Sequence, residues 1–193
     1  MNTLKAEKRD MSIKAKKLRR EGYVTGNVFG REIEGSIPIQ IEKSAVEKLL
    51  KTNGKGSQIL LETDGTVHNV LIKEVQFNSM KSQVDEIDFQ ALVKGEKVHS
   101  VAEIFLLNHE MVNTGVVQQL LHEVAYRADP AHLVDKIELD VGHMKAGDIL
   151  KVKDLAIAKD ENIDLQTDPE ADVVTVTEVH TAPDEEESAE ENA

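Results

Sequence analysis

The sequence predicts a mainly β protein of the α+β class, with an N-terminal six-stranded-type β-barrel that carries one or two helices, a second β-rich domain and a disordered acidic tail. Apolar residues alternate with polar ones at the period of a strand, as in Ile37, Ile39 and Ile41. Turn signals separate such segments at short intervals. The 193 residues are 40% hydrophobic, with 4 Phe, 2 Tyr and no Trp, so Leu, Ile and Val must form most of the core.

The first half contains six segments with strand character. These are residues 2–8, 23–29, 36–41, 58–63, 67–75 and 85–93. Asp64-Gly65, between the fourth and fifth segments, is the strongest hairpin signal in the chain. Residues 12–20 are expected to form one or two helical turns that end at Gly22, and residues 43–50 to form a helix with a left-handed stop at Asn53-Gly54. Six strands of this kind favour closure into a barrel.

The second half also has strand character, at residues 98–107, 122–128, 136–141 and 172–179, with a turn at Gly147-Asp148. The apolar run at 115–121 is expected to form one helical turn. From residue 183 the chain reads PDEEESAEENA, which has six acidic residues and no large apolar side chain to bury. We therefore expect domains at 1–94 and 95–182 and a disordered acidic tail at 183–193.

The formal net charge of -13 hides an uneven distribution. Residues 1–95 carry 16 Lys and Arg against 13 Asp and Glu, whereas residues 96–193 carry 7 against 23. Within residues 1–31 the ratio is 9 to 3 in favour of the cations. A polyanion such as nucleic acid would be attracted to this first segment and repelled by the second half.

Several classes of protein are excluded or disfavoured. No apolar run approaches the roughly 18–20 residues that span a bilayer, and the N-terminus has no apolar signal region. We expect a cytoplasmic protein with no membrane partner. The chain has no cysteine, which excludes disulfides, thiolate metal sites and a cysteine nucleophile.

No motif for catalysis or for cofactor binding is present. The 7 histidines form no His-Glu-x-x-His pattern, and there is no Gly-x-Ser-x-Gly elbow, phosphate loop or Gly-x-Gly-x-x-Gly. We therefore expect no enzyme activity, no metal, no cofactor and no small-molecule substrate.

The basic run at residues 14–20, KAKKLRR, has two interpretations. A charge run is often only a solvated face. Here, however, it lies close in sequence to Tyr23 and Phe29 in a β-rich scaffold with few other aromatic residues. Arginine binds phosphates and stacks on bases, so the run is also typical of an RNA-binding surface.

Motifs over residues 4–179 resemble the bacterial large-subunit ribosomal protein family that binds 5S ribosomal RNA, in the two-domain form that includes the general stress protein Ctc. The matching stretches are LKA at 4–6, LRREG at 18–22, FG at 29–30, VLIKEV at 70–75, IDF at 87–89, GVVQQ at 115–119, IELDV at 137–141 and GDI at 147–149. Their order and spacing carry the resemblance.

The resemblance implies that the barrel grips an internal-loop region of 5S ribosomal RNA through its minor groove, on the large ribosomal subunit in the cytoplasm. Arg9 and Arg20 match RNA-contacting arginines of the family, and Asp88 matches a contacting acid. The full set of candidate RNA-binding residues is Arg9, Lys14, Lys16, Arg19, Arg20, Phe29, Glu86 and Asp88.

Two candidates depart from the family pattern. Phe29 stands where the family has Tyr, and Glu86 stands where it has His, which places an anion at the expected RNA face. Residue 25 is Thr where the family has Pro, and residues 77–83 lack the usual His-Pro. An alternative is therefore a diverged, stress-associated paralogue with weakened RNA binding that acts through protein partners of its acidic C-terminal domain.

Overall fold

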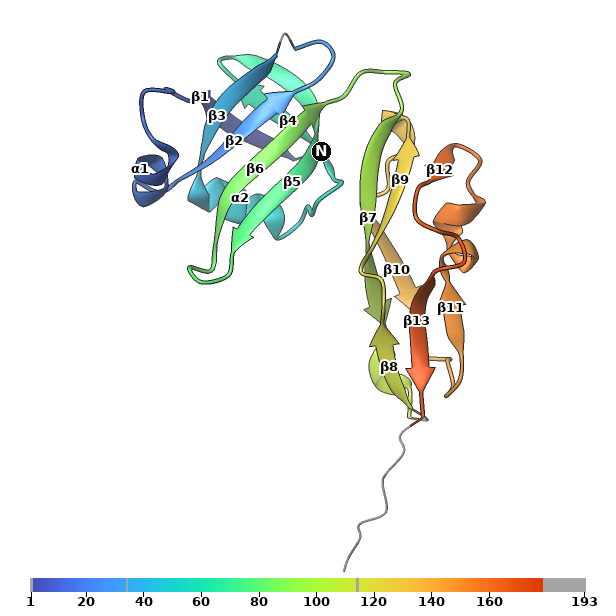
Figure 1. Ribbon diagram of the computed structural model, residues 1–193. Coiled ribbons are helices and arrows are strands. Elements are labelled where there is room, and N and C mark those ends of the chain that lie inside the picture. The colour runs from blue at the N-terminus through green and yellow to red at the C-terminus, as the bar shows by residue number, and fades with distance from the viewer. Residues whose placement is uncertain (1, 34, 114, 179–193) are drawn as a thin grey trace, which may run out of the picture.

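The protein, seen here in a computed structural model, is described over residues 2–33, 35–113 and 115–178. The expected tail at 183–193 lies outside these residues. Two β-rich domains follow one another along the chain (Figure 1). The predicted fold class is confirmed.

The first domain is a closed barrel of six strands in the order β1-β3-β2-β6-β5-β4. Its elements are β1 (Thr3–Lys8), α1 (Ala15–Arg20), β2 (Tyr23–Phe29), β3 (Ser36–Glu42), α2 (Lys43–Leu50), β4 (Gln58–Thr63), β5 (Thr66–Asn78) and β6 (Gln83–Ala91). The barrel closes because β1 pairs in parallel with β4 and, at Glu7 and Lys8, antiparallel with β3.

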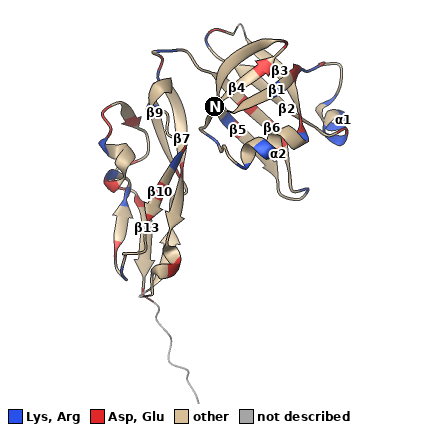
Figure 2. Ribbon diagram, turned by 180° about the vertical axis from the view of Figure 1, so that it is seen from behind, with Lys and Arg blue, Asp and Glu red and all other residues tan. Residues whose placement is uncertain are grey.

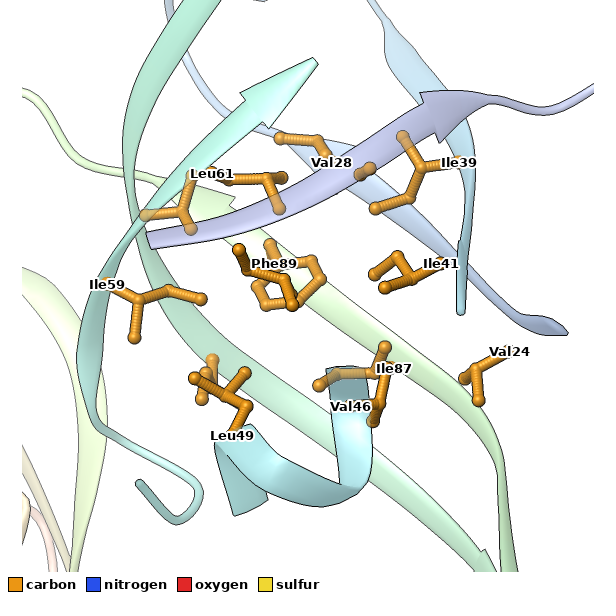
Figure 3. Packing of buried hydrophobic residues seen from close by; sticks show 14 of the residues in the cluster. Val24, Val28, Ile39, Ile41, Val46, Leu49, Ile59, Leu61, Ile87 and Phe89 are labelled. Carbon is orange, nitrogen blue, oxygen red and sulfur yellow. The ribbon is translucent and has the colours of Figure 1, made fainter. Parts of the chain in front are cut away.

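Alternation along the strands fills the barrel with aliphatic side chains (Figure 3). Ile39 and Ile41 from β3 and Ile59 from β4 meet Phe89 from β6, and each is fully buried. Helix α2 adds Val46 to the same core. Val24 and Val28 of β2 are buried in the same core. The residues that alternate with the buried ones along β2 and β6 therefore point away from the barrel core.

Two turn predictions had different outcomes. Asp64 and Gly65 have φ angles of 50° and 79°, as the predicted tight hairpin requires. The prediction of a left-handed stop at Asn53-Gly54 was wrong. Helix α2 ends at Leu50, its C-cap Lys51 is right-handed, and the positive φ of 88° falls at Gly56.

The second domain contains two sheets with a shared core. One has the order β10-β7-β9-β12 and the other β11-β13-β8. The elements are β7 (Val98–Leu107), η1 (His109–Met111), β8 (Val116–Gln119), β9 (Glu123–Ala128), η2 (Pro130–His132), β10 (Lys136–Asp140), β11 (Ile149–Lys151), η3 (Val152–Asp154), η4 (Ala156–Lys159), β12 (Ile163–Leu165) and β13 (Asp172–Thr177).

The helical turn expected at 115–121 was wrong, because Val116–Gln119 forms strand β8. Its residues pair with β13, from Val116 opposite Thr177 to Gln119 opposite Val174. A short apolar run fits either a buried turn or a strand. Here pairing with the distant strand β13 determines that the segment is a strand.

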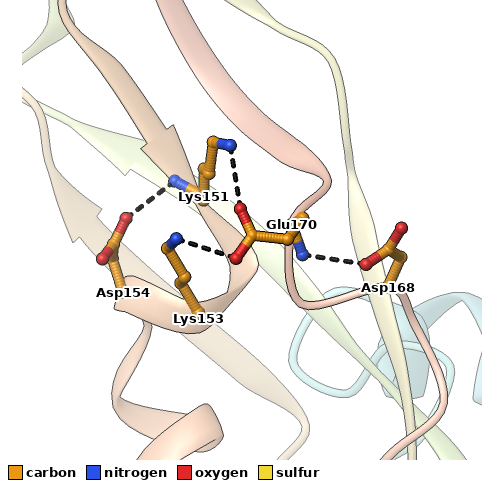
Figure 4. Close-up of polar contacts among 5 residues, drawn as sticks. All are labelled: Lys151, Lys153, Asp154, Asp168 and Glu170. Atoms are coloured by element: carbon orange, nitrogen blue, oxygen red, sulfur yellow. Dashed lines mark hydrogen bonds and ion pairs between the residues drawn. The ribbon is translucent and has the colours of Figure 1, made fainter.

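A polar cluster joins β11 and η3 to the loop before β13 (Figure 4). Glu170 accepts hydrogen bonds from Lys151 Nζ at 3.0 Å and Lys153 Nζ at 2.8 Å, and its backbone N–H donates to Asp168 Oδ1 at 2.9 Å. The bond from Lys153 is the main reason that the pKa of Glu170 lies below its ordinary value. Glu170 and Lys153 are exposed and Lys151 is partly exposed, so the cluster fixes the loop without adding much stability.

The two domains meet where the segment between α2 and β4, together with β5, contacts the second domain. Lys73 Nζ donates to the carbonyl oxygen of His99 at 2.8 Å, and Ser57 Oγ lies 3.1 Å from Asp135 Oδ2. Gly56 approaches so closely that a Cβ there would lie 2.0 Å from the carbonyl oxygen of Val101. The junction therefore requires glycine at position 56.

We predict that Gly56→Ala changes the spacing between the domains. The native chain has no cysteine, so one dye can be attached in each domain, at Glu47→Cys and at Lys159→Cys. Energy transfer between the dyes then reports the distance between the domains. The new methyl group cannot fit against Val101, so the dye-to-dye distance distribution should shift or broaden.

Gly65→Ala is the matched control for Gly56→Ala. Gly65 also has a positive φ, of 79°, but its Cβ would meet no atom within 4 Å. This variant should lose stability, by about 1 kcal/mol, without any change in the distance. An unchanged distribution in Gly56→Ala would refute the junction as described.

Candidate nucleic-acid interface

The basic run forms the short helix α1, which packs on the barrel through one buried side chain. Leu18 is 3% exposed, whereas Lys14, Lys16, Lys17 and Arg20 are exposed. Gly22, with φ of 92°, turns the chain from the helix into β2. Since successive helical residues are rotated by about 100°, Lys16 and Arg20, each two positions from Leu18, lie on the open side of the helix. Figure 2 shows the basic residues of α1 in blue.

Arg19 fixes this helix to the barrel. Its Nε donates to the carbonyl oxygen of Asp85 at 3.0 Å, and its Nη2 lies 3.4 Å from Thr25 Oγ1. Thr25 is 1% exposed on β2, and Asp85 lies on β6. One guanidinium thus connects α1 to two neighbouring strands.

Arg9 has a similar local role after β1. Its Nη2 donates to the carbonyl oxygen of Ile13 at 3.2 Å, and its backbone N–H donates to Pro38 at 2.9 Å. Asp10 Oδ1 accepts from the backbone N–H of Ser12 at 2.8 Å. The bonds from Ser12 lower the pKa of Asp10. Arg9 and Asp10 therefore shape the loop that leads into α1.

Asp88 connects β2 and β6. Its Oδ1 accepts hydrogen bonds from the backbone N–H of Asn27 at 2.9 Å and from Asn27 Nδ2 at 3.3 Å. The strands approach closely here, since a Cβ on Gly26 would lie 1.8 Å from the carbonyl oxygen of Ile87. The carboxylate thus satisfies a backbone donor that the strand ladder leaves free.

The remaining two candidates lie on the same strands. Glu86 is paired in register with Thr25, near the Arg19 contact, and is half-buried. Phe29 is in register with Gln90 at the far end of β2, four residues beyond Thr25 and roughly 13 Å away at the rise of a strand. The structure therefore brings Glu86 close to α1 and places Phe29 away from it.

The β5–β6 hairpin beside α1 contributes residues that sequence reasoning missed. Asp85 Oδ2 accepts from Asn78 Nδ2, and its Oδ1 accepts from Gln83 Nε2, both at 3.0 Å. These bonds, with a smaller contribution from the Arg19 charge, lower the pKa of Asp85. An acid–amide cluster across a hairpin has no signature in the sequence, because the bulge at Asp85 decides which side chains meet.

One surface groove of the first domain contains none of the candidate residues. It is a groove of about 770 Å³ beside β1 and α2, lined by Leu4, Tyr23, Ile41 and Leu49 among others. The described part of the chain contains no group of three or more metal-ligating side chains. None of the described helices has the length and apolar character to cross a bilayer.

We predict that Asp88→Ala destabilises the protein by about 1–3 kcal/mol, because it leaves the backbone N–H of Asn27 without its acceptor. Asp88→Asn should cost less, since the amide oxygen can still accept that bond. Chemical denaturation followed by circular dichroism would measure both. Equal stability of Asp88→Ala and the wild type would contradict a bridging role.

Comparison with known proteins matches both halves of the chain. Residues 4–89 match the Ribosomal L25p family, and residues 97–180 match the family described as ribosomal protein TL5, C-terminal domain. A relative from Caldanaerobacter subterraneus subsp. tengcongensis, named large ribosomal subunit protein bL25, is 30% identical over 188 residues, which cover 96% of this chain and 94% of the relative.

Two further relatives have the same name. The Enterococcus faecalis protein is 34% identical over 88% of this chain and 84% of its own length. The Bacillus velezensis protein is 28% identical over 100% of this chain and 94% of its own length. Since the similarity covers both domains and nearly the whole length of these relatives, the chain belongs to the bL25 family of ribosomal proteins.

Proposed function

We propose that the protein binds 5S ribosomal RNA as a component of the large ribosomal subunit in the cytoplasm. The proposed contact surface consists of α1 and the outward side chains of β2 and β6. The relatives named above are proteins of the large ribosomal subunit. The observation that carries the proposal is that Arg19 and Leu18 hold α1 on the barrel, which leaves its other cations exposed.

Two kinds of contact would act together at this surface. Lys14, Lys16, Lys17 and Arg20 would neutralise phosphates, which supplies affinity without base specificity. Of these four, only Lys17 forms an ion pair among the described residues, with Glu21 at 3.8 Å. The rigid strands beneath would read the shape of an irregular groove, as RNA-binding sheets do.

The charge of the second domain supports confinement of the RNA to the first. Residues 96–178 carry 7 Lys and Arg against 17 Asp and Glu. An RNA strand that approached this surface would be repelled. No contact of the described residues specifically favours the stress-associated alternative.

We predict that the double variant Lys16→Ala/Arg20→Ala weakens binding of the full chain to 5S RNA about tenfold or more in a filter-binding titration. The slope of log affinity against log salt should become shallower by roughly 1 for each phosphate contact that is lost. Both side chains are exposed, so folding should be unaffected.

The matched control is Lys48→Ala/Lys51→Ala, which removes the same charge from the exposed end of α2. It should change the affinity less than about twofold. If the two double variants behave alike, binding depends on net charge alone and α1 is not the interface. Salt-insensitive binding of micromolar strength or weaker in the wild type would contradict the proposed function itself.

Substitution of Glu86 tests the same proposal through an expected gain, rather than a loss, of affinity for 5S RNA. Its carboxylate lies on the proposed RNA face, so Glu86→Gln should raise the affinity for 5S RNA about threefold to tenfold, by removing repulsion between like charges. Glu47→Gln on the exposed face of α2 should have no effect. Weaker binding in Glu86→Gln would show instead that this carboxylate accepts a hydrogen bond from the RNA.

A further inference from the structure

One sheet of the second domain exposes large apolar side chains on its outer face. Along β7, Ile104 points into the core and is 5% exposed, whereas Phe105 and Leu107 point outward and are 47% and 43% exposed. Exposed apolar side chains that share a face often mark an interaction site.

Acidic residues border these two side chains. The parallel register of β7 and β10 places Phe105 beside Glu138 and Leu107 beside Asp140. Asp140 is held in place by the backbone N–H of Gly142, which donates to its Oδ1 at 3.0 Å. The one cation of β10, Lys136, pairs with Glu138 at 3.0 Å and offsets its charge, so the net charge of this strand is the single negative charge of Asp140. The patch is therefore apolar in its centre and carries a net negative charge along one side.

The patch continues an interface that already exists. Toward its start, β7 meets the barrel, where Gly56 lies against Val101 and Lys73 binds the carbonyl oxygen of His99. On the neighbouring strand β9, Glu123 Oε2 lies 3.2 Å from Lys55 Nζ of the first domain. Strand β7 runs away from the segment that joins the two domains (Figure 1). Phe105 and Leu107 therefore follow, along the same strand, the residues that contact the barrel.

We propose that Phe105, Leu107, Glu138 and Asp140 form a docking surface for a basic protein segment, in which an apolar side chain is flanked by Lys or Arg. The apolar centre would bury the anchor side chain, and the carboxylates would select the flanking cations. The acidic border would repel RNA, so a basic protein segment is the occupant that the charges favour. The docking surface is separate from the proposed RNA interface on α1.

The other sheet supplies a comparison surface. Val116 and Ile149 are 50% and 52% exposed there, next to Thr177 and Thr175 across the strands. The neighbours are uncharged, so this surface gives no electrostatic reason to prefer a basic partner. It is an equally exposed control.

The test is an NMR titration of the full chain at about 150 mM salt with two synthetic peptides, Lys-Lys-Leu-Phe-Lys-Lys and Glu-Glu-Leu-Phe-Glu-Glu. We expect saturable shifts of the amides of β7 and β10 with the basic peptide alone. Phe105→Ser/Leu107→Ser should weaken binding at least fivefold, and Val116→Ser/Ile149→Ser should not. In Glu138→Gln/Asp140→Asn, the amide oxygen at position 140 can still accept the bond from the backbone N–H of Gly142. Both negative charges are lost, so this variant should also bind the basic peptide more weakly.

Three outcomes would overturn the proposal. These are no saturable shift, equal binding of the acidic peptide, or shifts that spread over all acidic surfaces and survive in the Phe105→Ser/Leu107→Ser variant. All four substituted side chains of the two serine variants are exposed, and an unchanged amide spectrum would verify the fold. No RNA is present, so the result is independent of the RNA-binding proposal.

Discussion

The contact between Arg19 and the carbonyl oxygen of Asp85 determines how the basic segment is presented. Helix α1 has only six residues, which is too short to be stable by itself. It persists because Leu18 is buried against the barrel and Arg19 bonds to both β2 and β6. An arginine that the sequence marks only as one more charge therefore acts as a positioning residue, and the exposed cations around it depend on that attachment.

Basic and acidic residues are also separated along the chain. Charge that would attract a polyanion is concentrated in the first 31 residues, and the acidic residues are concentrated in the second half. The junction at Gly56 and Lys73 holds the two domains in contact. Opposite electrostatic surfaces are thus kept in different domains of one molecule, which is what the two proposed binding surfaces require.

Local patterns in the sequence predicted much of the fold. Alternation, strand propensity and turn signals found the six barrel strands and four strands of the second domain, and Asp64-Gly65 found the hairpin, because these signals depend on neighbours in sequence. Strand β8 was missed because its partner β13 is distant in sequence, and β11 and β12 were missed because three residues carry no periodicity. The candidate site was predicted as a set of charges. The sequence did not reveal that Arg9, Arg19 and Asp88 bond to backbone groups. The contacts of Arg19 and Asp88 arise only once the barrel is closed, and the contact of Arg9 with Ile13 depends on the shape of the loop after β1.

The central claim is that Arg19 positions α1 while Arg20 faces the RNA. Amide hydrogen exchange of α1 in the free protein, compared between Arg19→Met and Arg20→Met, tests it most directly because both variants lose one charge. We expect faster exchange of the amides of Leu18 and Glu21 in Arg19→Met and unchanged exchange in Arg20→Met, with 5S RNA binding weakened in both. Unchanged protection of α1 in Arg19→Met would contradict the account, because the helix would then be held without the contact on which the proposed interface depends.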